Sequence, residues 1–431
     1  MTIKTLIDKF RTSKVRETVI CSLLAVLIGA LLGLISGFFG RILEFIEEFR
    51  AEHYLILVPF LGLAGVLIIF LYKHFSPNSE QGLNLAIAYN MGEVDNNGEI
   101  KDFGHAQKIG QYPDGYVLLK LISNSIMLLF GASTGKEGTV ATCGAAIGDY
   151  ISRIFKARKY SRILLITGVS AAVSGLFQTP LGGLFFALEF SAVGILFYQA
   201  LIPALICAYT ACYISKVCGL AAFSHTVSAT AAITPKVAFL IVVCSIVFGI
   251  AGRLFAGALH EAHRFYDSRI KNRYIGILIG GSIMAVLLIF AARGRYCGTG
   301  AAMLSELLLA NTTHYYDFII KFVFTIACIV IGFSGGEMMP IMTIGASLGA
   351  VMSQLTGLPF ELTVVMGCTA VYSSATNTLL APMFIGIEMF GINTTIYIAV
   401  TCIIAFAING NRSVYTKQGH IPRYMYSALR K

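Results

Sequence analysis

The sequence predicts an all-α integral membrane protein built from two related halves with broken helices. Three observations indicate this fold class. Apolar residues make up 56% of the 431 residues and charged residues only 13%, which is unlike any set of soluble domains. Long apolar stretches recur from Val19 to Asn409, so the chain contains many membrane segments rather than one anchor. Glycine interrupts many of these stretches, and the interruptions repeat along the chain.

Basic clusters set the expected orientation of the elements. Lys and Arg gather at residues 4–16, 153–162, 264–273 and 412–431, and such clusters are retained on the cytoplasmic side of a membrane. We therefore interpret the formal net charge of +10 as a topology signal and expect no nucleic-acid partner. A multi-pass protein of the plasma membrane is predicted, surrounded by the lipid bilayer, with both termini in the cytoplasm.

The first element, residues 1–18, is basic and amphipathic, which indicates a helix on the cytoplasmic face. Val19 to Leu43 should then cross outward, and Leu55 to Tyr72 should return. An acidic turn is expected between them on the outside, formed by Glu44, Glu47, Glu48 and Glu52. A polar loop is expected on the inside at residues 73–115.

The later apolar runs are cut into pieces. They cover residues 116–152, 163–219, 236–259, 274–293, 316–356 and 361–410. Many pieces are shorter than the roughly 20 residues of a full crossing. Broken backbone at membrane depth is tolerated only where protein or a water-filled cavity covers it. We assign residues 19–219 to a first transmembrane half, 220–411 to a second, and 412–431 to a cytoplasmic tail.

Two pairs of segments repeat along the chain. Residues 131–148, GASTGKEGTVATCGAAIG, match residues 332–349, GFSGGEMMPIMTIGASLG, at an offset of 201. Residues 179–189, TPLGGLFFALE, match residues 378–388, TLLAPMFIGIE, at an offset of 199. Halves of about 200 residues are typical of repeat-built transporters, in which the site lies where broken helices meet near the midplane.

The first repeated segment carries a carboxylate at a predicted helix start. Small residues from Gly131 to Gly138 break a helix, and the unsatisfied N–H groups of the next helix attract anions. An ionised Glu137 in this apolar setting costs several kcal/mol unless it is paired or solvated. It can occupy the anion site as a carboxylate or leave it as a neutral acid. The alternative is a permanent helix cap, or a pair with Lys136.

Other chemistry finds little support. The 10 Cys are scattered singly and the 8 His show no ligand spacing, so no metal and no cofactor are expected. No HExxH or Walker motif is present in the sequence, which argues against an enzyme. A receptor or scaffold would leave Glu137 unexplained.

These motifs resemble a known family. GKEGT at residues 135–139 is similar to the GREGP motif of the CLC anion channels and transporters, and GGEMMP at residues 335–340 is similar to their GxFxP motif. Tyr415 falls where that family carries its pore tyrosine. The resemblance covers nearly the whole chain. It implies a CLC-like inverted-repeat helical bundle with broken, tilted helices, assembled as a homodimer with one pore per subunit.

The departures from the common CLC pattern resemble one branch, the fluoride/proton antiporters. Gly82 to Ala86 replaces GSGIP, so the pore serine is missing, and ATNT is present at residues 375–378. Phe190 stands where chloride exchangers carry an inner proton-transfer glutamate. We interpret the neighbouring Glu189 and its repeat partner Glu388 as structural.

The resemblance also implies a set of site residues. Glu137 is the expected gate shared by anion and proton. Glu337 is the hypothesised inner proton acceptor, and the alternative is a structural pair with a basic residue. The implied anion-binding positions are Leu83, Asn84, Gly138, Thr139, Met338, Met339 and Tyr415. The residues Leu83, Met338 and Met339 offer no donor, so they either narrow the passage or belong to the core.

The expected function is export of fluoride in exchange for protons. Fluoride is small and strongly hydrated, so its site must replace the lost water with closely placed donors. The preference for fluoride is implied by the resemblance. A chloride/proton exchanger or a passive anion channel of the same fold is the alternative.

Overall fold

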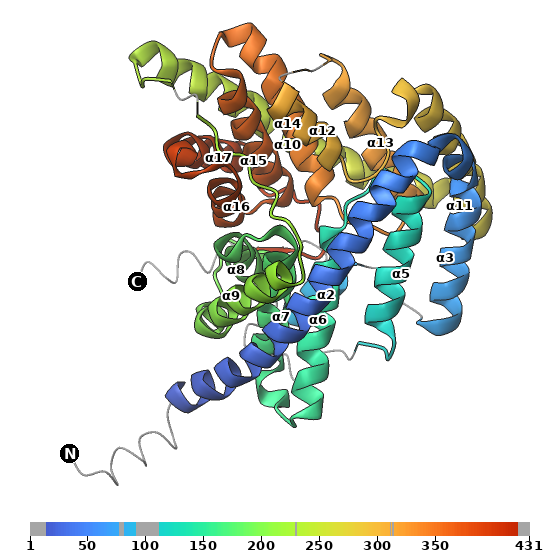
Figure 1. Cartoon of the computed structure of the whole chain (residues 1–431), viewed down its shortest axis with the longest axis vertical. Helices are drawn as coiled ribbons and strands as arrows, with labels where there is room; N and C mark the ends of the chain where they lie inside the picture. The colour runs from blue at the N-terminus through green and yellow to red at the C-terminus, as the bar shows by residue number, and fades with distance from the viewer. Residues whose placement is uncertain are drawn as a thin grey trace.

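The computed structural model describes residues 14–76, 82–91, 112–228, 231–310, 312 and 314–420. Within these residues the fold is almost entirely helical (Figure 1), which confirms the predicted all-α class. Seven segments of the described chain are long and apolar enough to cross a membrane. Most of the helix predicted at residues 1–18, and the tail beyond residue 420, lie outside the described residues.

The two halves have the same order of helices. The first half contains α2 (Lys14–Leu57), α3 (Leu61–Phe75), α4 (Leu83–Met91), α5 (Tyr116–Leu129), α6 (Glu137–Ile154), α7 (Ser161–Phe177), α8 (Pro180–Glu189) and α9 (Leu201–Val217). The second half contains α10 (Pro235–Arg269), α11 (Arg273–Phe290), α12 (Ala301–Ala310), α13 (Asp317–Ile331), α14 (Met338–Thr356), α15 (Phe360–Thr376), α16 (Leu380–Phe390) and α17 (Thr395–Asn409). In Figure 1, α6 to α9 form the lower part of the molecule and α12 to α17 the upper part.

The predicted acidic turn is wrong. Helix α2 spans Lys14–Leu57 with a kink only at His53, and all four glutamates of the predicted turn lie in its helical part before that kink, in the long blue helix of Figure 1. Residues 41–57 contain no Gly or Pro and are rich in Glu, Leu and Arg, which are strong helix formers. The helix bends only at His53, shortly before Pro59.

The polar loop predicted at residues 73–115 is also partly wrong. Helix α3 continues to Phe75, and α4 spans Leu83–Met91. Gly82 precedes α4 with φ +55, a left-handed conformation that glycine adopts without a Cβ penalty. Leu83 and Asn84 are therefore the first two residues of α4, and the helix sets their backbone conformation.

The internal repeat is visible in the helix packing. In the first half, α6 crosses α7 so closely that a Cβ on Gly144 would overlap the Gly168 carbonyl oxygen. In the second half, a Cβ on Gly345 would overlap the Gly367 carbonyl oxygen in the crossing of α14 and α15. The matched glycines of the sequence are thus the residues that let two helices touch in each half.

The second matched pair of segments, α8 and α16, packs face to face with reciprocal contacts. Phe185 and Phe384 stack with their ring centroids 4.4 Å apart. The Glu189 carboxylate accepts hydrogen bonds from the Leu380 and Ala381 N–H groups at 2.9 and 3.0 Å. The Glu388 carboxylate accepts from the Leu181 and Gly182 N–H groups at 3.0 and 2.8 Å.

Each of these glutamates therefore caps the helix of the other half, which is the geometry of a structural pair. The contacts are exchanged between two equivalent elements, as expected for halves related by a local two-fold axis.

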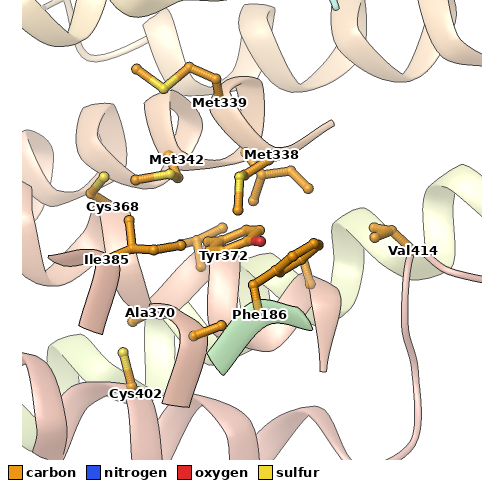
Figure 2. Close-up of a cluster of buried hydrophobic side chains, with 14 of the residues drawn as sticks. Phe186, Met338, Met339, Met342, Cys368, Ala370, Tyr372, Ile385, Cys402 and Val414 are labelled. Carbon is orange, nitrogen blue, oxygen red and sulfur yellow. The ribbon is translucent and has the colours of Figure 1, made fainter. Parts of the chain in front are cut away.

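A large apolar core lies between the halves and surrounds the helix starts. Figure 2 shows part of it, with Met338 and Phe186 on either side of the Tyr372 ring. The chain returns to this region after α17, where strand β2 (Gly419–His420) pairs in parallel with strand β1 (Ala192–Val193). This pairing holds the segment that contains Tyr415 against the core.

Candidate ion-exchange site

Helices α6 and α14 start side by side, one from each half. The segments that precede them form a reciprocal backbone pair, in which Gly135 N donates to Gly336 O at 2.5 Å and Gly336 N donates to Gly135 O at 2.8 Å. The Asn124 side-chain amide donates to the carbonyl oxygens of Gly135 and Ser334 at 3.1 and 3.3 Å. The N-cap residues of both helices make no side-chain cap bond, so the first N–H groups of both helices point to the same region, where the Glu137 carboxylate interacts with some of them.

Glycine is required at this crossing because of the close approach of the two chains. A Cβ on Gly336 would lie 2.5 Å from the Gly138 nitrogen, and a Cβ on Gly138 would lie 3.0 Å from the Gly336 Cα. These atoms belong to the backbone and cannot rotate away. The glycine breaks in the sequence therefore create the meeting point of two helix N-termini.

Glu137 is the first residue of α6 and is only 2% exposed. Its Oε2 accepts a hydrogen bond from the Lys136 N–H at 3.0 Å, whereas its Oε1 is buried and has no hydrogen-bond partner. The Met339 backbone amide also interacts with this carboxylate, so the start of the other half contributes to its surroundings. The described chain has no ion pair between Glu137 and Lys136, although the charge of Lys136 acts on the carboxylate.

Glu337 occupies the equivalent place at the start of α14, one residue earlier. It is the N-cap residue of that helix and is half-buried. Its carboxylate interacts with the Tyr415 hydroxyl and, through space, with Glu137. No basic side chain forms an ion pair with it in the described part of the chain, so the structural pair considered from the sequence has no partner here. Tyr372 is fully buried beside Tyr415 and Glu337.

A cavity of about 780 Å³ opens next to the two helix starts. Of the predicted site residues, it brings together Leu83, Asn84, Gly138, Thr139, Glu337 and Tyr415. Residues of the C-terminal part of α10 line it as well, together with Lys271 and Arg273. The same cavity therefore borders both the helix starts and the basic cluster at residues 264–273, which the sequence predicts to face the cytoplasm.

Two of the predicted anion-binding residues lie elsewhere. Met338 and Met339 are each 3% exposed and do not line the cavity. Met338 packs against the Tyr372 ring (Figure 2), whereas the Met339 amide faces Glu137. Their side chains occupy the apolar core, which matches the second interpretation offered from the sequence.

Asn84 connects the cavity to the C-terminal segment. Its Oδ1 accepts a hydrogen bond from the Lys417 N–H at 3.2 Å, and its side-chain NH₂ group has no bond to other described residues. Leu83 beside it is 6% exposed. Asn84 therefore supports the segment that carries Tyr415 and keeps a donor near the cavity.

Phe190, at the position where the resemblance placed an inner glutamate, lies in the apolar core. Phe190 is fully buried and stacks against Phe186 with ring centroids 5.8 Å apart. Its carbonyl oxygen accepts from the Gln418 side chain at 3.3 Å. Glu189, the nearest carboxylate in sequence, is used as a helix cap.

Sequence reasoning missed two buried lysines. Lys120 in α5 is 4% exposed, lies over the Tyr72 ring at 5.0 Å and lines the cavity. Lys321 in α13 is fully buried and donates to Ser133 Oγ, Tyr296 O and Gly298 O at 2.9, 3.2 and 2.8 Å. The two lysines are separated by the same offset of 201 as the matched glycines. A lone charge within an apolar run, repeated in register, was the signal that could have identified them.

The arrangement supports a defined chemistry. The N–H groups of two helix starts favour an anion near Gly138. The buried Lys120, which lines the same cavity as Gly138, adds a positive charge. The buried carboxylate of Glu137 competes for the same field, and it no longer does so when it is protonated. Exchange of one anion against one proton at a common position is therefore chemically available to these residues.

Comparison with known proteins agrees with this architecture. The model of the voltage-gated chloride channel family matches residues 64–410. A chloride/fluoride channel protein of Pseudomonas syringae pv. tomato is 30% identical over 406 residues, with 92% of this chain and 86% of that protein covered. Among solved structures, a CLC-type fluoride/proton antiporter is 33% identical with a TM-score of 0.88, covering 93% of this chain and 98% of that one.

A more distant structure shares the fold. A slow cyanobacterial Cl⁻/H⁺ antiporter superposes with a TM-score of 0.78 at 19% identity, covering 95% of this chain and 98% of that one. The family model covers most of the chain, and the described residues contain several segments that can cross a membrane. The chain is therefore a multi-pass membrane transport protein that belongs to the voltage-gated chloride channel (CLC) family.

Proposed function

We propose that this protein exports fluoride from the cytoplasm in exchange for protons, with Glu137 as the gate shared by the two ions. It acts in the plasma membrane, with both termini in the cytoplasm and two copies assembled as a homodimer. The single observation that carries this proposal is the state of Glu137. Its carboxylate is buried at the start of α6, and among the described residues its Oε1 has no hydrogen-bond partner and no basic side chain forms an ion pair with it.

The energetic argument follows from that setting. A buried carboxylate with an unpaired oxygen is costly in its ionised form. Two changes relieve the cost: the side chain takes up a proton, or it moves to where water reaches it. An anion bound at the helix start offsets the positive field that the N–H groups exert on the Glu137 carboxylate, and it thereby promotes either change. Binding of the anion at the helix start is therefore linked to binding of the proton by Glu137.

Glu337 is proposed to take the proton on the inner side. It borders the cavity, contacts the Tyr415 hydroxyl and interacts with Glu137. Phe190 cannot serve in this role because a phenyl ring does not titrate. Tyr415, Asn84 and the N–H groups after Gly138 supply donors for a small, strongly hydrated anion.

Likeness to relatives supports fluoride over chloride. The chain has 33% identity to the solved fluoride/proton antiporter and 19% to the solved cyanobacterial Cl⁻/H⁺ antiporter. An exchanger that prefers chloride, or a passive anion channel of the same fold, remains the second candidate, because an H⁺/Cl⁻ exchange transporter of Vibrio vulnificus is 24% identical over 441 aligned positions.

Halide efflux from proteoliposomes tests the proposal. Vesicles are loaded with fluoride or with chloride, efflux is recorded with ion-selective electrodes, and proton uptake is recorded in the same sample. The proposal expects rapid fluoride efflux coupled to proton uptake, and chloride efflux slower by at least tenfold. Equal rates for both halides would support the chloride exchanger, and fluoride efflux without proton uptake would support the channel.

A further inference from the structure

The cytoplasmic half of the cavity is lined by titratable residues of α10. His260, His263, Tyr266 and Asp267 follow one another at helical spacing and all border the cavity that contains Glu337. Residues three or four positions apart lie on one face of a helix. The end of α10 therefore presents a continuous polar stripe between the inner carboxylate and the basic cluster at Lys271 and Arg273.

His260 lies closest in structure to the site itself. One of its ring nitrogens faces the backbone of Ser413, and the Ser413 hydroxyl accepts a hydrogen bond from the Tyr415 N–H at 3.1 Å. Tyr415 in turn contacts Glu337. His260 Nε2 is buried and lacks a hydrogen-bond partner in the described protein, and so does the Tyr266 hydroxyl. Two buried polar atoms of this stripe therefore have no hydrogen-bond partner among the described residues.

The charged neighbours of the two imidazoles are of both signs. Glu261, Arg264 and Arg412 act on His260, and Asp267 acts on His263. The imidazoles also act on each other. Among the helices packed against α10, α14 contributes Glu337 at its start to the shared cavity. Lys120, Lys271 and Arg273 also line this cavity. No carboxylate forms an ion pair with either histidine in the described residues.

We propose that His260 and His263 form the route by which protons leave Glu337 for the cytoplasm, through the same cavity that admits the anion. This inference rests on the proposed function. Histidine is the side chain that ordinarily changes charge near neutral pH and relays protons. Glu337 gives its proton to a neutral imidazole, which becomes an imidazolium and then releases one proton to bulk water. The carboxylate is left ionised and ready for the next proton from Glu137.

The test compares the double variant His260→Gln/His263→Gln with wild-type protein in proteoliposomes, recording fluoride efflux and proton uptake together. We expect coupled exchange to slow by about tenfold to a hundredfold, because a positioned proton carrier contributes about a hundredfold or more where proton transfer limits the rate. Added imidazole buffer should restore much of the rate, since the cavity of about 780 Å³ admits a small soluble carrier. The apparent KM for fluoride should stay unchanged.

Two controls separate proton relay from other roles. His53→Gln removes a histidine of α2 that stacks on Phe49 away from the cavity, and it should behave as wild type. In the Glu137→Gln background no proton passes the gate, so the histidine substitutions should leave the remaining fluoride flux unchanged. If the double variant does not purify as a monodisperse protein, coupled exchange is measured in the single variant His263→Gln instead, because the His263 side chain is half-exposed.

The contrary outcomes are distinct. An unchanged coupled rate, a loss that imidazole does not restore, or an equal loss of fluoride flux in the Glu137→Gln background would overturn the relay. A wild-type protein that moves fluoride without protons would instead overturn the proposed function on which the relay depends.

Discussion

The reciprocal caps at Glu189 and Glu388 yield a sharp prediction, because one of them neighbours the lost proton-transfer position. Each carboxylate accepts two backbone N–H groups at the start of the other half's helix, at 2.8–3.0 Å. Hydrogen bonds to a charged group contribute about 1.5–3 kcal/mol each. Glutamine keeps the shape but has one acceptor oxygen and no charge, so each Glu→Gln variant loses roughly one such bond.

We therefore expect Glu189→Gln and Glu388→Gln to destabilise the protein by similar amounts, about 2 kcal/mol each. The assay is the midpoint of thermal loss of monodisperse protein in detergent, measured by size-exclusion chromatography, together with the proton/fluoride ratio of reconstituted protein. Both variants should lower the midpoint alike and leave the ratio unchanged. A fall of the ratio in Glu189→Gln alone would refute the structural interpretation, because it would make Glu189 a proton carrier.

Three further predictions concern the site and its support. Glu337→Gln should reduce coupled proton uptake at least tenfold while the thermal midpoint stays within a few degrees, and unchanged coupling would exclude Glu337 from the proton path. Gly336→Ala should destabilise the protein by about 2–4 kcal/mol, because the new Cβ would lie 2.5 Å from the Gly138 nitrogen and force apart the Gly135–Gly336 pair; a normal thermal midpoint and normal transport would disprove the tight crossing. Lys321→Met should cost about 2–4 kcal/mol, because the carbonyl oxygens of Tyr296 and Gly298 lose their buried donor, and a stability equal to wild type would show that the amine is dispensable.

Much of the fold could be predicted from sequence because its signals are local and repeated. Apolar runs predict membrane helices, and glycines at matched positions predict their breaks. A helix is expected over Val140 to Ile151, after the break at Gly131 to Gly138, and α6 starts earlier, at Glu137 inside that break. The caps made by Glu189 and Glu388 agree with the structural interpretation because both occur at the same register of the repeat.

The errors arose where charge was taken as a sign of a loop. The glutamates of residues 44–52 lie within α2, because no Gly or Pro ends that helix. Asn84 falls within the predicted polar loop but is the second residue of α4. In both cases local helix propensity was stronger than the polarity of single side chains.

The site was predictable only in part, because long-range packing completes it. The carboxylates follow from the repeated motifs, and the cavity brings Glu337 and Tyr415 together as expected. Nothing local distinguishes a core methionine from one beside a pore, so the place of Met338 against Tyr372 could not be derived. The packing of α10 near Glu337 likewise depends on tertiary structure. Only this packing brings His260 and His263 to the same cavity as Glu337.

The most direct measurement is proton uptake by Glu137→Gln compared with wild type, in vesicles that contain fluoride and no pH gradient. The account predicts that wild-type protein takes up protons as fluoride leaves, and that the variant moves no protons whatever its rate of fluoride efflux. Proton uptake in the variant that still follows fluoride efflux at the wild-type ratio would contradict the assignment of Glu137 as the shared gate.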